Sequence, residues 1–520
     1  MTRLLRAAGS ISIFTLLSRI LGLVRDRLMA QTLGAGWVQG TFLLAWTLPN
    51  LMRRLLGEGA LSASLVPAYA KARRSGDPEA ARALLAQVTG TVTTLLLPLC
   101  LGVAALSLVM PAEWLPAPEQ GGVEAMRLLL GLNAVLFAYA LPVCLTAVFS
   151  GALNTLGVFA LPAAVPIVLN VFWIVALLVA RPLGIEVDVE VANFAAWCLS
   201  VGGVAQLLLV VVPLWRLGEL RRPRLGLPTR GSAAFGVFVA MGPTVVGMSL
   251  NQVSSLLDQL MAYFLVAPGA VTYIYLANRL LLFPHALTAM SVAVAVFPKL
   301  AHEANDTDRS QLRRTLDLAA AATILVTLPA SCGLIVLGDD VVRVLFAGGK
   351  FVEADVWPTV LTTSCLVAGL PFIGLAQLYA RGFYAVGDPG TPARLAARLV
   401  ITNAALNLVL VLSTNLGTAA LALSSSLSSL VNAMLLARRF HGHAEPGHGL
   451  RSAWLRSGLA TAAMCAVLPY VRVAPAGASL LWRALGDLAL PMVVGMLVYL
   501  AAHVLLRSPE LRALRRRRAP

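Results

Sequence analysis

The sequence predicts an all-α polytopic membrane protein with about 14 transmembrane helices. Of its 520 residues, 58% are hydrophobic and only 12% are charged, and the mean hydropathy is +0.82. A soluble domain carries about 25% charged residues. Apolar stretches of about 20 residues, long enough to cross a hydrocarbon core of ~30 Å, recur along the chain with polar segments between them.

The first predicted span begins close to the N-terminus, and five more follow it. The first stretch is interpreted as a span and not as a cleavable signal, because no small-residue cleavage site follows its apolar run. Internal charges interrupt the apolar pattern of the first two spans. The six predicted spans cover residues 8–28, 36–56, 84–110, 125–150, 159–180 and 191–215.

Further apolar stretches continue the pattern to the end of the chain. They cover residues 233–266, 271–298, 312–337, 356–381, 394–412, 417–437, 453–471 and 482–506.

The six cysteines are scattered singly through the apolar runs, and none forms a CxxC pair. Neither disulfides nor zinc sites are therefore expected.

The charges of the loops predict the orientation of the chain. If the N-terminus is cytoplasmic, most of the 40 lysines and arginines fall in cytoplasmic segments, and the acidic segments PAEWLPAPEQGGVE and GIEVDVE fall outside. This distribution follows the positive-inside rule and places both termini in the cytoplasm. The same bias explains the net charge of +16, so no nucleic-acid partner is expected.

Two separate pairs of segments repeat at a nearly constant spacing. LPNLMRR through SLVPAYAK is echoed by LANRLLL through AVFPKLA, and GALNTLGVFALPAA is echoed by GFYAVGDPGTPARL, at offsets of 228 to 231 residues. Because an even number of spans separates the copies, the two halves share one orientation in the membrane. The sequence therefore predicts two parallel six-helix lobes, residues 1–225 and 226–440, and a region 441–520 with two extra helices and a basic cytoplasmic tail.

Charged residues occur inside the apolar segments of both lobes. The eighth span contains Arg279, which follows the asparagine that repeats Asn50. A charge at mid-bilayer costs from roughly 2.5 kcal/mol upward. Any single arginine could snorkel to the surface or form a local ion pair. The charged residues of the first two spans are Arg19, Arg25, Asp26, Arg53, Arg54 and Glu58.

Arginines drawn from both lobes favour a central cationic cavity over separate local pairs. Substrate sites of transporters built from parallel repeats lie between the repeats. Guanidinium is planar, permanently charged and suited to bidentate contact with phosphate oxygens. The expected ligand is therefore an anion, and a phosphate or pyrophosphate fits best.

Several segments of the chain, three of which contain these arginines, carry a family resemblance. SRILGLVRD, LPNLMRRLLGEGALSASLVPAY, LANRLLLFP, LFAGGKF and ARGFYAVGDPGTP resemble, in order and spacing, the MurJ (MviN) lipid II flippases of the multidrug/oligosaccharidyl-lipid/polysaccharide (MOP) exporter superfamily. The resemblance covers residues 5–440; the last two helices match in position and hydrophobicity only. It implies a bacterial inner-membrane protein that moves lipid II, an undecaprenyl-pyrophosphate disaccharide-pentapeptide, from the inner to the outer leaflet by alternating access.

The resemblance also implies the site residues and partners. Substrate binding falls to the arginine positions that match the family motifs, with one acidic partner. The implied partners are lipid II, membrane lipids and the cell-wall synthesis machinery. The resemblance also implies a monomer that is not an enzyme and that has no cofactor apart from Na⁺. The implied substrate-binding residues are Arg19, Arg25, Arg53, Arg54, Glu58 and Arg279.

The chain departs from the family pattern at two positions. Gly40 stands where the family usually has an aspartate, and Asn278 stands where an acid often precedes the arginine of the eighth span. Both changes remove negative charge near the cationic site, which raises its expected affinity for anions. They also argue against a mechanism that relies on those acids as proton or gating switches.

A second group of polar residues suggests a cation site. Asp258 is a lone acid deep in the seventh span, and Asn403 and Asn407 share one face of the eleventh at i,i+4 spacing. Oxygen ligands with one charge suit a hard cation, and some relatives are similar in having a sodium site between these helices. The alternative is a buried Asp258 that is protonated or hydrogen-bonded to its neighbours.

Two other functions remain open at this point. A different MOP-superfamily exporter, of polysaccharide lipids or drugs, has the same fold, although a cationic-drug exporter would carry net acid in its cavity. A membrane glycosyltransferase using lipid II would need a catalytic carboxylate in an outer loop. The acids available for that role are Glu113, Glu119, Asp339 and Asp340, on short loops without a recognisable motif.

Overall fold

The computed structural model describes the chain as an assembly of helices. It describes residues 2–55, 61–75, 77–287, 289–304, 310–442, 448–473, 475 and 479–509. Within these ranges the β-structure is one isolated bridge between Gly348 and Phe351, which confirms the predicted all-α class. The helices form two compact units, Met1–Thr272 and Tyr273–Pro520.

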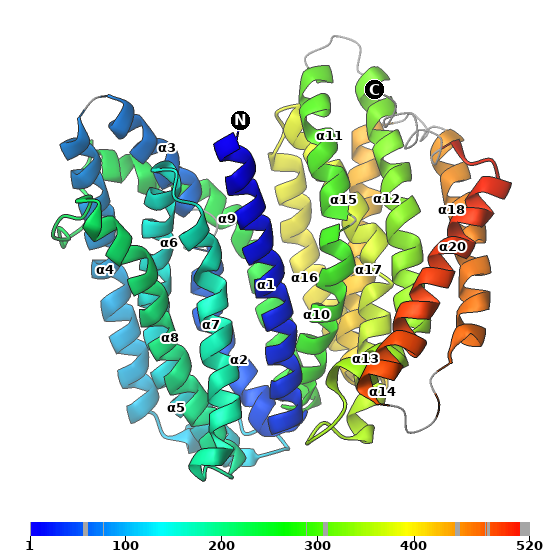
Figure 1. The fold of residues 1–520 in the computed structure, drawn as a ribbon, viewed down its shortest axis with the longest axis horizontal. Coiled ribbons are helices and arrows are strands. Elements are labelled where there is room, and N and C mark those ends of the chain that lie inside the picture. Colours follow the sequence, from blue (N-terminus) through cyan, green and yellow to red (C-terminus); the bar gives the residue numbers. More distant parts are fainter. Residues whose placement is uncertain are drawn as a thin grey trace. The chain divides into compact units, whose positions relative to one another are not determined.

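The first unit contains nine α-helices and the beginning of a tenth among its described residues (Figure 1). In this unit α1 runs beside α7, and α8 packs against both α6 and α7. A π-helical turn, η5, extends α9. The elements are α1 (Thr2–Leu33), α2 (Trp37–Met52), α3 (Leu61–Arg74), α4 (Pro78–Val109), α5 (Gly122–Leu136), α6 (Ala140–Thr155), α7 (Ala160–Val179), α8 (Asp188–Arg216), α9 (Ala233–Met261), η5 (Ala262–Val266) and α10 (Ala270–Leu287).

The second unit is built around α12, α15 and α17. Helix α15 packs against both α12 and α17, and α14 also contacts α12 and α17. Helix α18 pairs with α20 and packs along α12. The elements are α11 (Ala289–Glu303), α12 (Ser310–Val336), α13 (Gly338–Phe346), α14 (Glu353–Val367), α15 (Leu370–Ala385), α16 (Gly390–Ser413), α17 (Thr418–His441), α18 (His448–Val467), α19 (Leu480–Arg483) and α20 (Leu490–Leu505).

Apolar helices long enough to cross a membrane occur in both units. Nine helical segments of the described residues meet that length and hydropathy, which makes the chain a multi-pass membrane protein. The count of 14 spans and the lobe boundary at 225/226 stay predictions. The nine segments are Pro78–Val109, Gly122–Thr155, Ala160–Val179, Asp188–Arg216, Ser310–Val336, Glu353–Ala385, Gly390–Ser413, Thr418–His441 and Leu480–Leu505.

Close packing in both units uses small residues, as is usual where helices meet in a membrane. A Cβ on Gly203 of α8 would lie 2.5 Å from the ring of Tyr139. In the second unit, a Cβ on Gly369 would lie 2.6 Å from Ser426 Oγ on α17. That hydroxyl donates to the carbonyl oxygen of Cys365 at 2.6 Å, so this contact fixes the turn between α14 and α15 against α17.

The sequence predicted no helix where α3 lies. Its three buried residues, Leu61, Leu65 and Tyr69, recur every fourth position and form one face. The helix has 14 residues and is about 21 Å long at ~1.5 Å per residue, which is too short to span a bilayer. A search for apolar stretches of about 20 residues therefore misses it.

Candidate functional site

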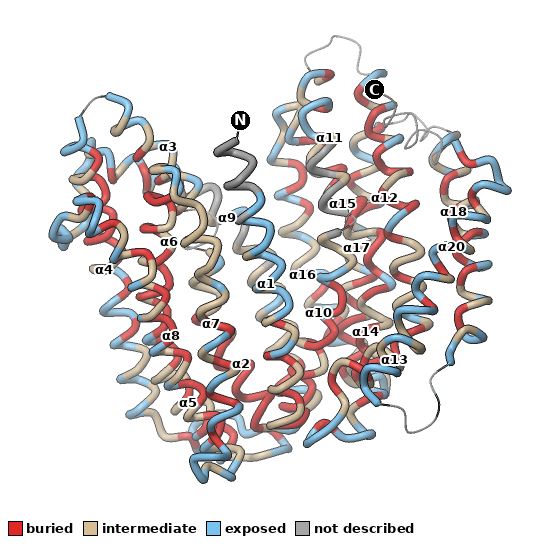
Figure 2. Tube along the Cα trace, in the orientation of Figure 1, coloured by how far each residue is buried: buried red, intermediate tan, exposed pale blue. Residues whose placement is uncertain are grey.

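Arg25 lies in the buried C-terminal part of α1, whereas residues 11–20 of the same helix are more exposed (Figure 2). Its Nε and Nη2 donate to Asp26 Oδ1 at 3.0 and 2.7 Å. Its Nη1 donates to Asn170 Oδ1 on α7 at 3.0 Å, and its guanidinium carbon lies 4.5 Å from the centroid of the Trp173 ring. The local pair of Arg25 with Asp26 is thus part of a larger network.

This network holds a positive charge in an apolar setting. Arg25 and Asp26 are 6% and 1% exposed, and removing two charges from water costs several kcal/mol for each ion. The hydrogen bonds and the cation–π contact offset that cost. Asn170 also ties the network to α1, because its Nδ2 donates to the carbonyl oxygen of Ser18 at 3.1 Å.

Aromatic rings of α2 pack against Trp173. Its ring centroid lies 5.6 Å from that of Phe42 and 5.2 Å from that of Trp46, and Trp46 lies 5.0 Å from Tyr139. Edge-to-face rings at these separations restrict one another's rotation. Asn170 and Trp173 are not among the residues predicted from the sequence. The available signal was an amide in the apolar run of α7 followed three residues later by a large aromatic residue.

The end of α2 positions two further arginines. Arg53 donates through Nε and Nη2 to Asn50 Oδ1 at 3.0 and 2.9 Å. The exposed Arg54 donates to Gln252 Oε1 of α9 at 3.5 Å. The i,i+3 spacing of Asn50 and Arg53 in the LPNLMRR motif brings these two side chains together. Glu58 lies outside the described residues.

Arg19 lies on the exposed part of α1. It precedes Arg25 by six residues, which turns it by about 240° around the helix at ~100° per residue. The two arginines therefore point in different directions, and Arg19 is not part of the network around Arg25.

Arg279 belongs to the second unit. It is half-buried on α10, where its Nη2 donates to the hydroxyl of Tyr275 at 3.2 Å and its guanidinium carbon lies 5.4 Å from the centroid of that ring. The neighbouring Asn278 is exposed and donates to the carbonyl oxygen of Ile274 at 3.0 Å. A tyrosine one turn away thus orients this arginine.

The residues of the predicted cation site are divided between the two units. Asp258 is half-buried on α9 of the first unit. Asn403 and Asn407 are buried on α16 of the second, where Asn407 Nδ2 donates to Asn403 Oδ1 at 3.4 Å. Asn403 Nδ2 donates to the hydroxyls of Ser424 and Ser428 on α17 at 3.1 Å. The shared face of the two asparagines is confirmed, and their amide and hydroxyl oxygens are the ligand type that Na⁺ uses; the sodium site itself stays a prediction.

A seam joins α2 to α9 and η5 within the first unit. Thr47 Oγ1 donates to Gln259 Oε1 at 2.5 Å, and the hydroxyls of Thr41 and Tyr263 are 2.8 Å apart. A Cβ on Gly40 would lie 1.8 Å from the carbonyl oxygen of Pro268. Gly40 therefore does more than remove an acidic side chain. It permits a backbone contact that leaves no room for any side chain.

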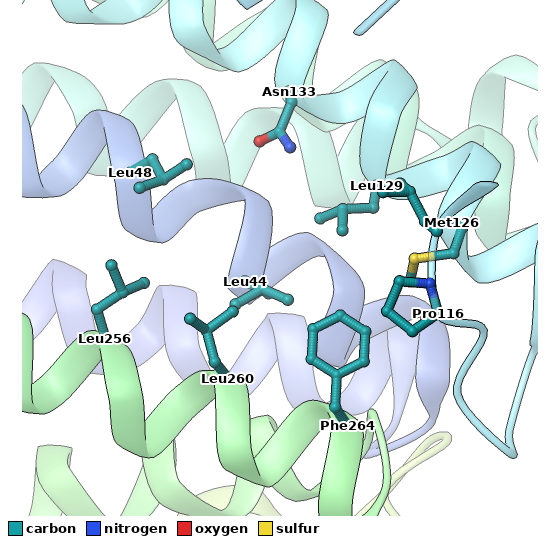
Figure 3. Close-up of a pocket in the computed structure, with 10 residues that line it drawn as sticks. Leu44, Leu48, Pro116, Met126, Leu129, Asn133, Leu256, Leu260 and Phe264 are labelled. Atoms are coloured by element: carbon teal, nitrogen blue, oxygen red, sulfur yellow. The ribbon is translucent and has the colours of Figure 1, made fainter. Parts of the chain in front are cut away.

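An apolar cavity of about 220 Å³ lies beside this seam (Figure 3). The side chains of α2, α5, α9 and η5 point into it from different sides. Asn133 contributes its one amide, whose Oδ1 is buried without a hydrogen-bond partner among the described residues. The lining has no charge to bind a pyrophosphate, so the cavity is distinct from the arginine sites. It is lined by Leu44, Leu48, Leu115, Pro116, Met126, Leu129, Asn133, Leu256, Leu260 and Phe264.

Comparison with known proteins gives a consistent result. The family model described as lipid II flippase MurJ matches residues 29–499. The chain is 32% identical over 448 residues to the probable lipid II flippase MurJ of Vibrio cholerae, covering 84% of this chain and 83% of that protein. It is 32% identical over 461 residues to the lipid II flippase MurJ of Burkholderia cenocepacia, covering 87% and 86% of the two chains.

Solved structures share the fold. A lipid II flippase MurJ in an inward closed conformation superposes with a TM-score of 0.76 at 23% identity, covering 96% of this chain and 98% of that one. An inward-facing multidrug resistance MATE family transporter of the MOP superfamily superposes with a TM-score of 0.65 at 15% identity, covering 87% and 98%. At these identities the likeness concerns the fold alone.

Proposed function

The chain belongs to the lipid II flippase MurJ family, and from this premise we propose that it moves lipid II from the inner to the outer leaflet of the bacterial inner membrane. The relatives named as lipid II flippases support the cargo. The multi-pass helical fold supports transport across a bilayer. Both termini lie in the cytoplasm in this proposal, because the basic loops then face inward.

The observation that carries the proposal is the buried network of Arg25. A carboxylate, an amide and an indole ring hold this guanidinium in one orientation, and a phosphate oxygen that replaces the neutral Asn170 oxygen would form a stronger, charge-assisted bond. Arg53 and Arg54 donate to the neutral amide oxygens of Asn50 and Gln252. Exchanging an amide oxygen for a phosphate oxygen strengthens such a bond, so Arg53 and Arg54 join Arg25 in the proposed pyrophosphate site. Arg279, and Arg19 from outside the Arg25 network, are its further proposed members.

Alternating access of the two predicted lobes, residues 1–225 and 226–440, is the proposed mechanism. The site opens inward, binds the pyrophosphate, and then opens outward to release it. An inside-negative potential favours outward movement of about two negative charges, by roughly 2.3 kcal/mol per charge per 100 mV. Na⁺ bound by Asp258, Asn403 and Asn407 is a second proposed ligand, and the transporter acts as a monomer that supplies the cell-wall synthesis machinery.

The exposed acid Glu113 fits transport better than glycosyl transfer. Exposed Glu113 pairs with Arg127 at 2.6 Å, and this partner holds the pKa of the Glu113 carboxyl below its usual range. Asp339 pairs with Arg343 at 2.7 Å and Asp340 with Arg472 at 3.2 Å. A general acid needs a pKa near the working pH, whereas an exposed, arginine-paired carboxylate such as Glu113 stays ionised.

Arginine variants in cells depleted of their own flippase test this proposal. Arg25→Ala and Arg279→Ala are expressed separately, and lipid II is measured in each leaflet. Both variants should leave lipid II in the inner leaflet. Arg314→Ala, an exposed arginine of α12, is the control and should restore outward transport. Normal outward lipid II in both site variants would contradict the arginine site.

A further inference from the structure

The segment between α8 and α9 lies against α4 in the first unit. We call residues 220–230 the strap. The N–H of Arg224 donates to the carbonyl oxygen of Ala86 at 3.1 Å, and the N–H of Gly226 donates to Thr94 Oγ1 at 2.9 Å. The main chain of the strap is thus bonded to α4.

A glycine on α4 makes this contact possible. A Cβ on Gly90 would lie 1.9 Å from the carbonyl oxygen of Arg224, so a larger residue would push the strap away. Next to it, Thr91 Oγ1 donates to the carbonyl oxygen of Gly226 at 3.1 Å. The position of the strap is therefore built into the sequence of α4.

An ionic cluster anchors the beginning of the strap. Glu219 is 5% exposed and accepts hydrogen bonds from the Tyr69 hydroxyl at 3.1 Å and from Arg73 Nη1 at 2.5 Å. Burial and the nearby Glu219 raise the pKa of Tyr69 to about 12, so this hydroxyl stays a donor at every physiological pH. Arg221 pairs with Glu79 at the start of α4.

The side chains of the strap face outward with an unusual composition. Arg222 and Arg224 are exposed and form no ion pair with a residue that the structure describes. Between and beyond them, Leu225 and Leu227 are 72% and 69% exposed. Positive charge and exposed apolar surface thus lie side by side on a fixed backbone.

The strap crosses α4 at the level where its apolar stretch begins. No charged residue occurs in α4 after Arg82. The bonds to Ala86 and Thr94 are about 6 and 18 Å beyond Arg82 along the helix at ~1.5 Å per residue. The headgroup zone of a bilayer is about 5–8 Å thick on each side, so the strap spans the boundary between headgroups and acyl chains.

We propose that the strap is a binding site for an anionic phospholipid of the cytoplasmic leaflet. Arg222 and Arg224 bind the headgroup phosphate, and Leu225 and Leu227 contact the first methylenes of the acyl chains. The leaflet assignment rests on the orientation in the proposed function. The exposed leucines favour a lipid over a soluble phosphate compound, because only a lipid covers their apolar surface.

The location gives the bound lipid a role in the transporter. The strap leads directly into α9, which packs against α2, α3 and α4 and carries Asp258. A lipid that holds the strap on α4 restrains the beginning of α9. Anionic lipid is therefore expected to affect the motion of α9 as well as the stability of the first unit.

Lipid titration of the purified full-length protein in detergent tests the site without reference to orientation. Phosphatidylglycerol and phosphatidylcholine are titrated, and bound lipid is counted by native mass spectrometry. The unaltered protein should prefer phosphatidylglycerol, and the double variant R222Q/R224Q should lose roughly 10- to 30-fold in affinity, at about fivefold for each arginine. The control R313Q/R314Q removes the same charge from α12 and should retain the high-affinity site.

Two outcomes would overturn the proposal. One is equal phosphatidylglycerol binding by R222Q/R224Q and the unaltered protein; the other is an equal loss in R313Q/R314Q. The variant L225S/L227S keeps the charge of the strap and tests the role of the leucines. It should bind phosphatidylglycerol more weakly than the unaltered protein does, while inorganic phosphate competes equally well for L225S/L227S and for the unaltered protein. Unchanged phosphatidylglycerol binding by L225S/L227S would mean that the strap binds only phosphate. Lipid II transport by the same preparations is a separate readout, so loss of transport with intact phosphatidylglycerol binding would count against the proposed function alone.

Discussion

Replacing Gly40 by alanine should open the seam between α2 and η5. The added Cβ would lie 1.8 Å from the carbonyl oxygen of Pro268, whereas real Cβ contacts are essentially never under 3.0 Å. The two backbones must therefore separate by about 1.2 Å or more. This separation would also strain the hydrogen bond between Thr41 and Tyr263, which lies next to the contact.

The cost of opening can be estimated from these two effects. Overpacking costs about 1–3 kcal/mol, and a lost hydrogen bond costs about 0.5–1.5 kcal/mol. Together they destabilise the closed seam by about 2–4 kcal/mol. Since every ~1.4 kcal/mol is tenfold in an equilibrium constant, the open population should rise by roughly 30- to 1,000-fold.

Cysteine labelling measures that population. Ala35→Cys is introduced at a buried position whose carbonyl oxygen meets Gly269, in a background without the six native cysteines. Maleimide should label Cys at this position at least about 30-fold faster in Gly40→Ala protein. Gly36→Ala is the matched control, because a Cβ there meets nothing within 4 Å. Equal labelling rates in the two variants would refute the argument from close contact.

Three further predictions concern other parts of the chain. Asn170→Ala removes an acceptor from buried Arg25 and should lower the stability of the protein by about 1.5–3 kcal/mol in thermal unfolding; the local Asn193→Ala should cost less, and an equal loss would contradict the role of the network. Tyr499→Phe deletes the bond from its hydroxyl to the carbonyl oxygen of Leu325 and should cost about 0.5–1.5 kcal/mol in the same assay; no change would mean that this bond does not hold α20 on α12. Hydrogen bonds from Thr391 hold the pKa of Asp388 below its usual range, so its contribution to stability is present above pH ~3.9 and is lost as the pH falls through the lower folded-state pKa. The unfolding temperatures of Asp388→Asn and the unaltered protein should therefore converge in acid, and a constant difference down to about pH 2 would exclude this explanation.

Hydropathy was sufficient to predict the helical membrane fold. Long apolar stretches leave a chain no alternative in a bilayer, because every backbone polar group must be bonded within its own helix. Helices such as α7 and α8 follow from this rule alone. The short α3 does not, since its burial depends on contacts with α6, α4 and α9 that hydropathy does not describe.

The candidate site was predictable in its charges but not in its contacts. The cost of a charge in the membrane identified Arg25 and Arg279. It gave no information about Asn170 or Trp173, which are ordinary residues of an apolar helix until α1 is packed against α7. From the sequence, Gly40 is visible only as a lost acid, because its neighbour Pro268 is far away in the sequence and close only in the fold.

Transport of lipid II by the purified protein tests the central claim most directly. The protein is reconstituted into liposomes that contain lipid II as the only undecaprenyl lipid, and the lipid II of each leaflet is measured over time with and without a membrane potential. We predict transfer above that of protein-free liposomes, faster when the potential is negative on the cytoplasmic side and lost in Arg25→Ala. Transfer no faster than in protein-free liposomes, with Arg25 in place, would contradict the account.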